Sequence, residues 1–295
     1  MAPIAITGAN GHLGKKLIQR LCGSPLRALV RSTRAADQVR KIAGHDVDVR
    51  IVDYTNLAQM RDALAGCERV VHLVGIIKEG AAASYQQAHE ASCEVLVEAL
   101  RGSSVQQIVY LSIVGSTLEA LNACLKSKGQ AQQILRNGTI PAVVLKVPMV
   151  LGENDYATAA LKKRASSRLA LMFNANSMEQ PIYAGDVIAA ICAIFERVVG
   201  PATFDLGGPR SLTRRDLTVR AAAVLNNSVR VVSLPLALGM LVALGLERLA
   251  NPPITRAMLG VLDHDDQIDN QPALTALGIS LTPLEETLTR VFQTP

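Results

Sequence analysis

The chain has 295 residues, of which 49% are hydrophobic and 19% charged, so it can bury a large core and is not a disordered or fibrous polypeptide. Aromatic residues are scarce, with no Trp, 5 Tyr and 4 Phe, and we therefore expect no nucleic-acid partner bound by base stacking. The formal net charge of +5 fits an anionic ligand or a membrane surface.

The cysteines and the N-terminal residues predict the cellular compartment of the protein. The chain has 5 Cys, none in a Cys-x-x-Cys pair, which predicts reduced thiols in a cytosol-like environment. No basic segment followed by an apolar run opens the chain, so we expect no secretory signal and a cytoplasmic location. The longest charge-free apolar run, residues 231–246, contains Pro235 and is shorter than the roughly 20 residues of a membrane span.

The first half of the chain alternates short apolar runs with segments of helical periodicity. Such alternation predicts βαβ units, whose right-handed crossovers give an α/β fold with a doubly wound parallel sheet (Rossmann) of six or seven strands. The predicted strands are 3–7, 26–31, 47–52, 69–74, 107–112 and 141–147, and the predicted helices are 12–22, 55–64, 84–101 and 121–136.

The second half predicts one more long helix over 184–198, a strand over 203–206 and two proline-interrupted helices within 234–262. We expect a nucleotide-binding Rossmann domain over 1–150, to which 181–200 returns. Residues 151–180 and 201–295 are expected to form a smaller substrate or partner lobe.

A glycine-rich turn joins the first predicted strand to the first predicted helix. Gly8, Gly11 and Gly14 have the spacing that permits a tight turn, close backbone approach to a pyrophosphate and close packing of helix on strand. The helix start would offer free N–H groups to the phosphates; the alternative is a purely structural turn. The candidate cofactor-binding residues of the turn are Thr7, Gly8, Asn10, Gly11, His12, Leu13 and Gly14.

The residues after the second strand predict which dinucleotide binds. An NAD binder usually places Asp or Glu there for the ribose hydroxyls, whereas this chain has Arg31, with Arg34 close by. Guanidinium groups suit a 2′-phosphate, so NADP(H) is favoured and NAD(H) is the alternative. Both arginines could instead be ordinary solvated surface residues.

The ends of the third and fourth strands would complete the cofactor pocket. Asp53, followed by Tyr54, can accept a hydrogen bond from an adenine amino group, and the backbone of Val74 and Gly75 would line the cofactor. An N-cap of the following helix explains Asp53 equally well. His72 has an alternating strand position and is interpreted as a core residue.

Four stretches carry a resemblance to a known family: 7–14, 71–76 (VHLVGI), 181–187 (PIYAGDV) and 204–217 (FDLGGPRSLTRRDL). They resemble the extended or atypical branch of the short-chain dehydrogenase/reductase superfamily. The sequence is most similar to the group around the NAD(P)H-binding accessory subunit of respiratory complex I and to related epimerase/dehydratase-like proteins. The leucine-rich tail from Leu234 also looks like that group.

The resemblance implies catalytic residues, and one of them is replaced. Catalytic members have a Ser at the end of the fifth strand and a Tyr-x-x-x-Lys pair on the next helix, where residues i and i+4 share a face. Ser112 matches the Ser and Lys128 the Lys, but Cys124 stands in the Tyr position. Within the same resemblance, the backbone of Val147 and Pro148 borders the nicotinamide, or is simply an ordinary strand exit.

Cys124 leaves two interpretations open. A thiol beside Lys128 would favour its thiolate and could exchange a proton, although its sulfur ends short of a phenol oxygen. The alternative is a small residue in a lapsed site. Tyr110 shares the face of Ser112 but lacks the Lys spacing, and Tyr85 and Tyr183 are other sources of a hydroxyl.

The apolar segment 234–250 has three interpretations: a buried helix, the lining of a pocket for a hydrophobic, isoprenoid-like substrate, or a peripheral contact with a membrane or partner protein. Lys162, Lys163, Arg164 and Arg168 could face anionic lipid or be a solvated helix face. No cluster has metal-ligand spacing, so we expect no metal.

The sequence therefore favours an NADP(H)-binding reductase of a hydrophobic carbonyl or quinone-like substrate. The rival is a non-catalytic accessory, assembly or redox-sensing protein, favoured by Cys124. A sugar-nucleotide epimerase comes third, because that chemistry depends on the missing Tyr. The oligomeric state is left open.

Overall fold

The computed structural model describes residues 2–43, 47–80, 83–249, 252, 255–261 and 265–293. The chain divides into two compact units. The first combines residues 1–146 with 190–204, and the second combines 147–189 with 205–295.

The first unit is built on a seven-stranded sheet in the order β11-β6-β5-β4-β1-β2-β3. β1 pairs in parallel with β2 and β4, and β2–β3 and β4–β5 are parallel as well. This order confirms the predicted doubly wound α/β fold. The strands are β1 (Ile4–Thr7), β2 (Leu26–Val30), β3 (Val47–Ile51), β4 (Arg69–His72), β5 (Gln107–Ile113), β6 (Ala142–Val147) and β11 (Ala202–Asp205).

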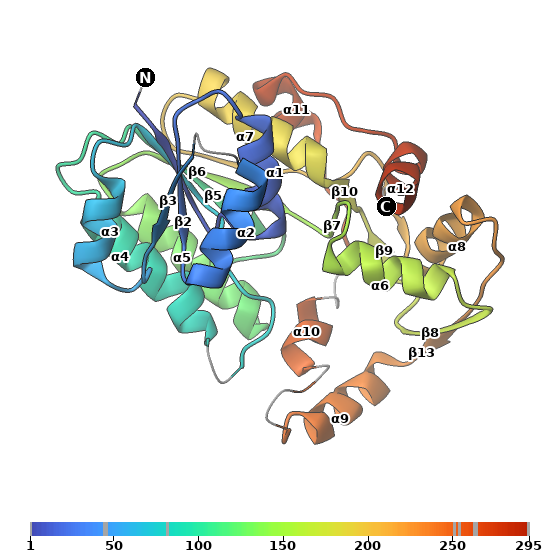
Figure 1. The fold of residues 1–295 in the computed structure, drawn as a ribbon. Helices are drawn as coiled ribbons and strands as arrows, with labels where there is room; N and C mark the ends of the chain where they lie inside the picture. Colours follow the sequence, from blue (N-terminus) through green and yellow to red (C-terminus); the bar gives the residue numbers. More distant parts are fainter. Residues whose placement is uncertain are drawn as a thin grey trace. The chain divides into compact units, whose positions relative to one another are not determined.

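Helices lie on both faces of this sheet (Figure 1). α3, α4 and α5 pack side by side, and α1 packs beside α2. They are α1 (His12–Arg20), α2 (Thr33–Ala43), α3 (Leu57–Leu64), the π-helix η1 (Gln86–Ala91), α4 (Ser92–Ala99), α5 (Ala123–Arg136) and α7 (Ala184–Arg197), which runs from one unit into the other.

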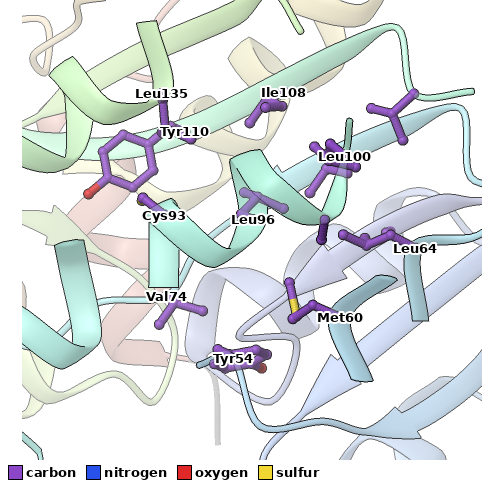
Figure 2. Packing of buried hydrophobic residues seen from close by; sticks show 14 of the residues in the cluster. Tyr54, Met60, Leu64, Val74, Cys93, Leu96, Leu100, Ile108, Tyr110 and Leu135 are labelled. Atoms are coloured by element: carbon purple, nitrogen blue, oxygen red, sulfur yellow. The ribbon is translucent and has the colours of Figure 1, made fainter. Parts of the chain in front are cut away.

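The core of the first unit consists of strand side chains packed against α3, α4 and α5. Tyr110 of β5 and Leu96 of α4 are fully buried, because β5 is covered by helices and its inward positions are apolar. Figure 2 shows part of this cluster, which includes Tyr54, Met60, Leu64, Val74, Cys93, Leu96, Leu100, Ile108, Tyr110 and Leu135.

Several local predictions are corrected by the structure. Residues 33–43 form helix α2, which the apolar pattern did not reveal, so Arg34 lies on a helix. The predicted helix 84–101 begins with a π-helical turn before α4. β4 ends at His72, two residues before the predicted end, so Val74 and Gly75 belong to the loop that follows the strand.

The second unit consists of short strands and helices. β7–β10 and β8–β13 pair in parallel, whereas β9–β12 are antiparallel, and apolar side chains of α6, α8 and α12 share one core. The elements are β7 (Val150–Leu151), α6 (Tyr156–Ala165), β8 (Leu169–Phe173), β9 (Met178–Glu179), β10 (Ile182–Tyr183), β12 (Leu212–Thr213), α8 (Arg214–Val224), β13 (Arg230–Leu234), α9 (Leu236–Leu246), α10 (Arg256–Val261), α11 (Gln271–Leu277) and α12 (Leu284–Gln293).

The apolar segment contains α9, which is buried on one face only. Gly239 packs against the ring of Phe173. The opposite face exposes Leu238, Leu241, Val242 and Leu244 by 45 to 67% of their surface, so the buried-helix interpretation is wrong for that face. The described residues do not include five positions of the predicted segments, namely 250, 251, 253, 254 and 262. Within the described part, no helix is both long and apolar enough to span a bilayer.

The predicted basic cluster is not one solvated patch. Lys162 donates a hydrogen bond to the Phe292 carbonyl, 2.9 Å away. Arg164 is half-buried, and this burial lowers its pKa, whereas Lys163 and Arg168 are exposed.

Candidate functional site

The glycine turn at the end of β1 has no room for side chains at two of its glycines. Gly8 has a φ of +67°, and a Cβ on it would lie 3.1 Å from the Leu73 backbone. A Cβ on Gly14 would lie 2.7 Å from the Gly8 carbonyl oxygen, so only glycine lets α1 pack this closely on the turn. Gly11 caps α1 without a side-chain hydrogen bond, and the first turn holds no acidic residue.

Two buried side chains hold the turn in place. The Tyr54 hydroxyl accepts from the Gly8 N–H at 2.9 Å and donates to the Leu29 carbonyl at 2.6 Å. Burial raises the pKa of Tyr54 to about 12, so the phenol stays protonated. Thr7 Oγ1 and His72 Nδ1 are 2.8 Å apart. Burial lowers the pKa of His72 to about 3, which makes it a neutral, fully buried residue, as its strand position indicates.

A cavity of about 170 Å³ lies beyond the ends of β2, β3 and β4. Arg31 stands exposed at this cavity, together with Asp53. The Asp53 carboxylate accepts from the N–H and hydroxyl of Thr55, and the N-cap of α3 is Asn56, so the N-cap interpretation of Asp53 is wrong. The residues lining the cavity are Arg31, Asp53, Tyr54, Thr55, Val74, Ala83, Gln87, Ala88 and Ser92.

These features fit a dinucleotide. The glycine turn and the start of α1, which no side chain caps, lie at the sheet edge where ligands of open α/β sheets bind. The cavity with its carboxylate and guanidinium lies at the same edge. Arg34, in contrast, is exposed on α2 and is not among the lining residues.

Lys128 lies one helical turn after Cys124 on α5, which begins at Ala123 because Asn122 caps it by accepting from the Cys124 N–H at 2.9 Å. The Lys128 ammonium donates to the Leu111 carbonyl at 3.1 Å and lies 4.5 Å from the Tyr110 ring centre. It also approaches the Val74 carbonyl at 3.5 Å. Burial lowers the pKa of Lys128 to about 8.

The Cys124 thiol is buried and protonated. Its sulfur donates to the Ile76 carbonyl at 3.6 Å. Burial raises the pKa of Cys124 to about 11 and outweighs the opposing effect of the Lys128 charge. Lys128 does favour the thiolate, as expected, but burial has the larger effect, so the thiol stays protonated.

The remaining candidates have separate surroundings. The Ser112 hydroxyl accepts from Gln132 Nε2 at 2.8 Å and is buried. Val147 ends β6 and is buried, and Pro148 follows it at the start of the second unit. In the described part of the chain, no group of three or more His, Cys, Asp or Glu side chains could hold a metal ion.

Sequence reasoning missed the contribution of the segment between β4 and α4. Gln87, Ala88 and Ser92 line the cavity, and His89 lies near Lys128. Tyr85, which the sequence did offer as a source of a hydroxyl, lies near Cys124. The position of this segment in the sequence could have predicted its role, because it follows β4 and therefore begins at the same sheet edge as the glycine turn.

Comparison with known proteins identifies a matching family model, described as NAD(P)H-binding, over residues 8–169. Two relatives are similar over most of the chain. Subunit 9 of the NADH dehydrogenase [ubiquinone] 1 alpha subcomplex, a mitochondrial protein of Arabidopsis thaliana, is 23% identical over 241 residues, covering 78% of this chain and 60% of that protein. Ceramide reductase of Caulobacter vibrioides is 26% identical over 238 residues, covering 79% of this chain and 73% of that protein. The chain thus spans less than two thirds of the plant relative.

A solved structure shows the same fold along nearly the whole chain. Triphenylmethane reductase of Citrobacter sp., complexed with NADP(H), superposes with a TM-score of 0.76 at 19% identity, covering 98% of this chain and 100% of that chain. At this identity the likeness concerns the fold alone.

Proposed function

Since the chain belongs to the NAD(P)H-binding family and has the extended short-chain dehydrogenase/reductase character that its motifs indicate, we propose that it is an NADP(H)-dependent reductase of a hydrophobic carbonyl or quinone-like substrate. The observation that carries the proposal is the convergence of the glycine turn, the Arg31 cavity and the buried Lys128 on the sheet edge where strands β1, β2, β4 and β5 end.

Arg31 favours the phosphorylated cofactor. Its guanidinium stands at the cavity near Asp53, where hydrogen bonds from Thr55 lower the pKa of the carboxyl and the Arg31 charge adds a smaller lowering. A cation at the end of β2 pairs with a 2′-phosphate, whereas a ribose hydroxyl is usually bound there by a carboxylate.

Lys128 and the Thr7–Gly14 turn would hold the cofactor, which supplies a hydride when bound. Lys128 is positioned by two carbonyl oxygens and an aromatic face, so it presents a fixed positive charge beside Gly75. A fixed charge in a dry site can orient a cofactor ribose and stabilise a developing oxyanion.

The name of one relative and the apolar residues of the second unit support a hydrophobic substrate. Ceramide reductase, named for a lipid, is similar over 79% of this chain. The second unit carries an apolar segment with several exposed leucines, which suits contact with a lipid-like molecule.

The second candidate function is that of a non-catalytic accessory or redox-sensing protein. Cys124 in the Tyr position favours it, as does the similarity to a subunit of a respiratory NADH dehydrogenase. Both candidates require the cofactor, and only the reductase requires turnover.

The cofactor claim is tested by fluorescence titration with NADPH and NADH. Wild type should bind NADPH more tightly, and Arg31→Ala should weaken NADPH binding by about 10- to 100-fold, since a charged hydrogen bond is worth about 1.5–3 kcal/mol. NADH binding should stay unchanged, and Arg40→Ala on the exposed side of α2 is the matched control. A preference for NADH in wild type contradicts the argument.

The reductase claim is tested by NADPH consumption against long-chain ketones, quinones and a cationic triphenylmethane dye. Lys128→Ala should lower the rate at saturating NADPH by at least tenfold. If no acceptor consumes NADPH, or if Lys128→Ala matches wild type, the reductase proposal fails and the accessory function is favoured.

A further inference from the structure

The glycine turn has few side chains of its own to hold it in place. Gly8 adopts a φ of +67°, and Gly11 precedes α1 without a side-chain cap. A glycine-rich backbone loses much conformational freedom when it is ordered, so such a turn binds phosphate more tightly if its neighbours fix it beforehand. The contacts that fix the turn therefore influence the affinity for the cofactor.

Two residues that line the cavity beyond β2, β3 and β4 are linked to this turn. Tyr54 reaches it directly, because its hydroxyl accepts from the Gly8 N–H. Ser92, the first residue of α4, reaches it through His72. His72 Nε2 lies 3.4 Å from Ser92 Oγ, and His72 Nδ1 lies 2.8 Å from Oγ1 of Thr7, the residue before Gly8. One imidazole thus joins the cavity wall to the start of the turn.

The direction of each hydrogen bond follows from the Ser92 hydroxyl. Ser92 Oγ donates its one proton to the Ala88 carbonyl at 2.8 Å, so it can only accept from His72 Nε2. Burial lowers the pKa of His72 to about 3, and a neutral imidazole has one N–H and one acceptor nitrogen. Nδ1 is therefore the acceptor, and the Thr7 hydroxyl donates to it. Every proton in this chain of hydrogen bonds has an acceptor.

The imidazole is held between fixed parts of the fold. Thr7 and His72 are directly paired residues of the parallel strands β1 and β4. The ring stacks on Tyr110 with centres 5.7 Å apart and planes 27° apart, and His72 is fully buried. At the far end of the chain, Ala88 belongs to the π-helix η1, a rare conformation that is frequent at functional sites, and lines the cavity beside Ser92. A stacked, buried ring has little freedom to turn away from either hydroxyl.

We propose that His72 is a positioning residue for the dinucleotide, and that it holds the glycine turn and the cavity wall in one fixed arrangement. This role rests on the proposed function, because a dinucleotide is the ligand that engages both the turn and the cavity. His72 is buried and acts through Thr7 and Ser92. Since the turn is ordered before the diphosphate arrives, binding does not have to order it.

Both ends of the chain can be cut while the ring stays in place. Thr7→Val replaces a hydroxyl with a methyl group of nearly the same size, and Ser92→Ala removes the acceptor of His72 Nε2. Each substitution removes one hydrogen bond, so we expect each to weaken NADPH binding by about 3- to 10-fold in a fluorescence titration. Thr218→Val, at an equally buried threonine of α8 in the second unit, is the matched control and should leave NADPH binding unchanged.

Substitutions of His72 itself test whether the ring joins the two ends. His72→Leu keeps most of the volume and removes both hydrogen bonds, so it should weaken NADPH binding by about 10- to 100-fold. Adding Thr7→Val to His72→Leu should have no further effect, because the bond that they share is already lost. His72→Asn keeps an acceptor oxygen at the position of Nδ1 and should bind NADPH more tightly than His72→Leu by about threefold or more. This order should hold although the smaller side chain leaves a cavity and lowers the thermal midpoint.

A packing role predicts instead that NADPH affinity follows the thermal midpoint across these variants. The positioning role is overturned, while cofactor binding stands, if Thr7→Val and Ser92→Ala bind NADPH like Thr218→Val. It is also overturned if Thr7→Val weakens binding equally in wild type and in His72→Leu. If His72→Leu does not fold, Thr7→Val and Ser92→Ala decide the question, because both keep the ring. If wild type binds neither NADPH nor NADH, the proposed function fails and takes this role with it.

Discussion

Lys128 is a cation enclosed by groups that do not carry a negative charge. Its ammonium contacts the carbonyl oxygens of Leu111 and Val74 and the face of Tyr110. Carbonyl dipoles and an aromatic quadrupole stabilise a cation less than water does, so burial penalises the charged form. The fold therefore bears a cost for Lys128 whenever that lysine is protonated.

This cost should depend on pH. The pKa of Lys128 is about 8 in the fold, against an ordinary value of 10.5. Below pH 8 the lysine is protonated in both states and the full cost applies. Between pH 8 and 10.5 the folded chain has released a proton that the unfolded chain keeps, so rising pH stabilises the fold. We expect the free energy of unfolding of wild type minus that of Lys128→Met to rise by on the order of 3 kcal/mol across this window.

Urea denaturation at half-unit pH steps measures this difference, because the other titrating groups are shared by the two proteins. Lys126→Met, at an exposed position on the same helix, is the matched control. A wild-type-minus-Lys128→Met difference that stays constant or falls between pH 8 and 10.5 would show that the buried ammonium carries no such cost.

Residues whose role depends on backbone geometry could be predicted from sequence, and residues whose role depends on a distant partner could not. The glycine turn was predictable because Gly8 and Gly14 are required by close backbone approach. The Tyr54 hydroxyl joins Gly8 to Leu29, and the Cys124 thiol meets the Ile76 carbonyl, only once the sheet is assembled. Neither pair is close in sequence, and so no local pattern indicates it.

At the scale of elements, α5 approaches the loop after β5 so closely that one of its residues must be glycine. A Cβ on Gly129 would lie 2.4 Å from the Thr117 carbonyl carbon and oxygen. This contact is with backbone, which cannot move aside like a side chain, and α5 also carries Cys124 and Lys128. The position of Cys124 and Lys128 therefore depends on this close packing.

We expect Gly129→Ala to lower the free energy of unfolding by about 1–3 kcal/mol, the usual cost of overpacking. Gly245→Ala, in α9, is the control, because a Cβ there meets nothing within 4 Å. That substitution should be neutral or stabilise by about 0.5–1 kcal/mol, since alanine favours helix over glycine. Urea denaturation followed by circular dichroism compares the two, and equal effects would refute the packing argument.

The predictability of an element follows its periodicity. Strands β2 and β5 were predictable because they are mostly buried runs of apolar residues, and β3 because apolar and polar residues alternate along it. Helix α2 does have a buried face, made of Ala35, Ala36 and Val39, but two of these three side chains are short alanines, so its apolar period was missed. The two-residue strands of the second unit are too short for any period, and their pairing is set by contacts between distant segments.

At the scale of the whole molecule, a net charge of +5 coexists with a helix that exposes apolar side chains. α9 contains no charged residue, and the exposed Arg248 follows soon after its end. Leu169 and Leu171 of β8 are also more than half exposed. Apolar side chains with a cation at the border suit an anionic lipid surface, where leucines enter the acyl boundary and an arginine meets headgroups.

We therefore expect the chain to co-float with vesicles that contain anionic lipid, and to do so less at high salt. Leu241→Asp together with Leu244→Asp should reduce binding by more than tenfold, because burying one leucine contributes about 1.5–3 kcal/mol and each 1.4 kcal/mol is a factor of ten. Val199→Asp, at a fully exposed apolar residue outside α9, is the matched control. Flotation that is absent, or that survives the α9 substitutions, would show that α9 is not a lipid-binding helix; loss with the control as well would point to net charge alone.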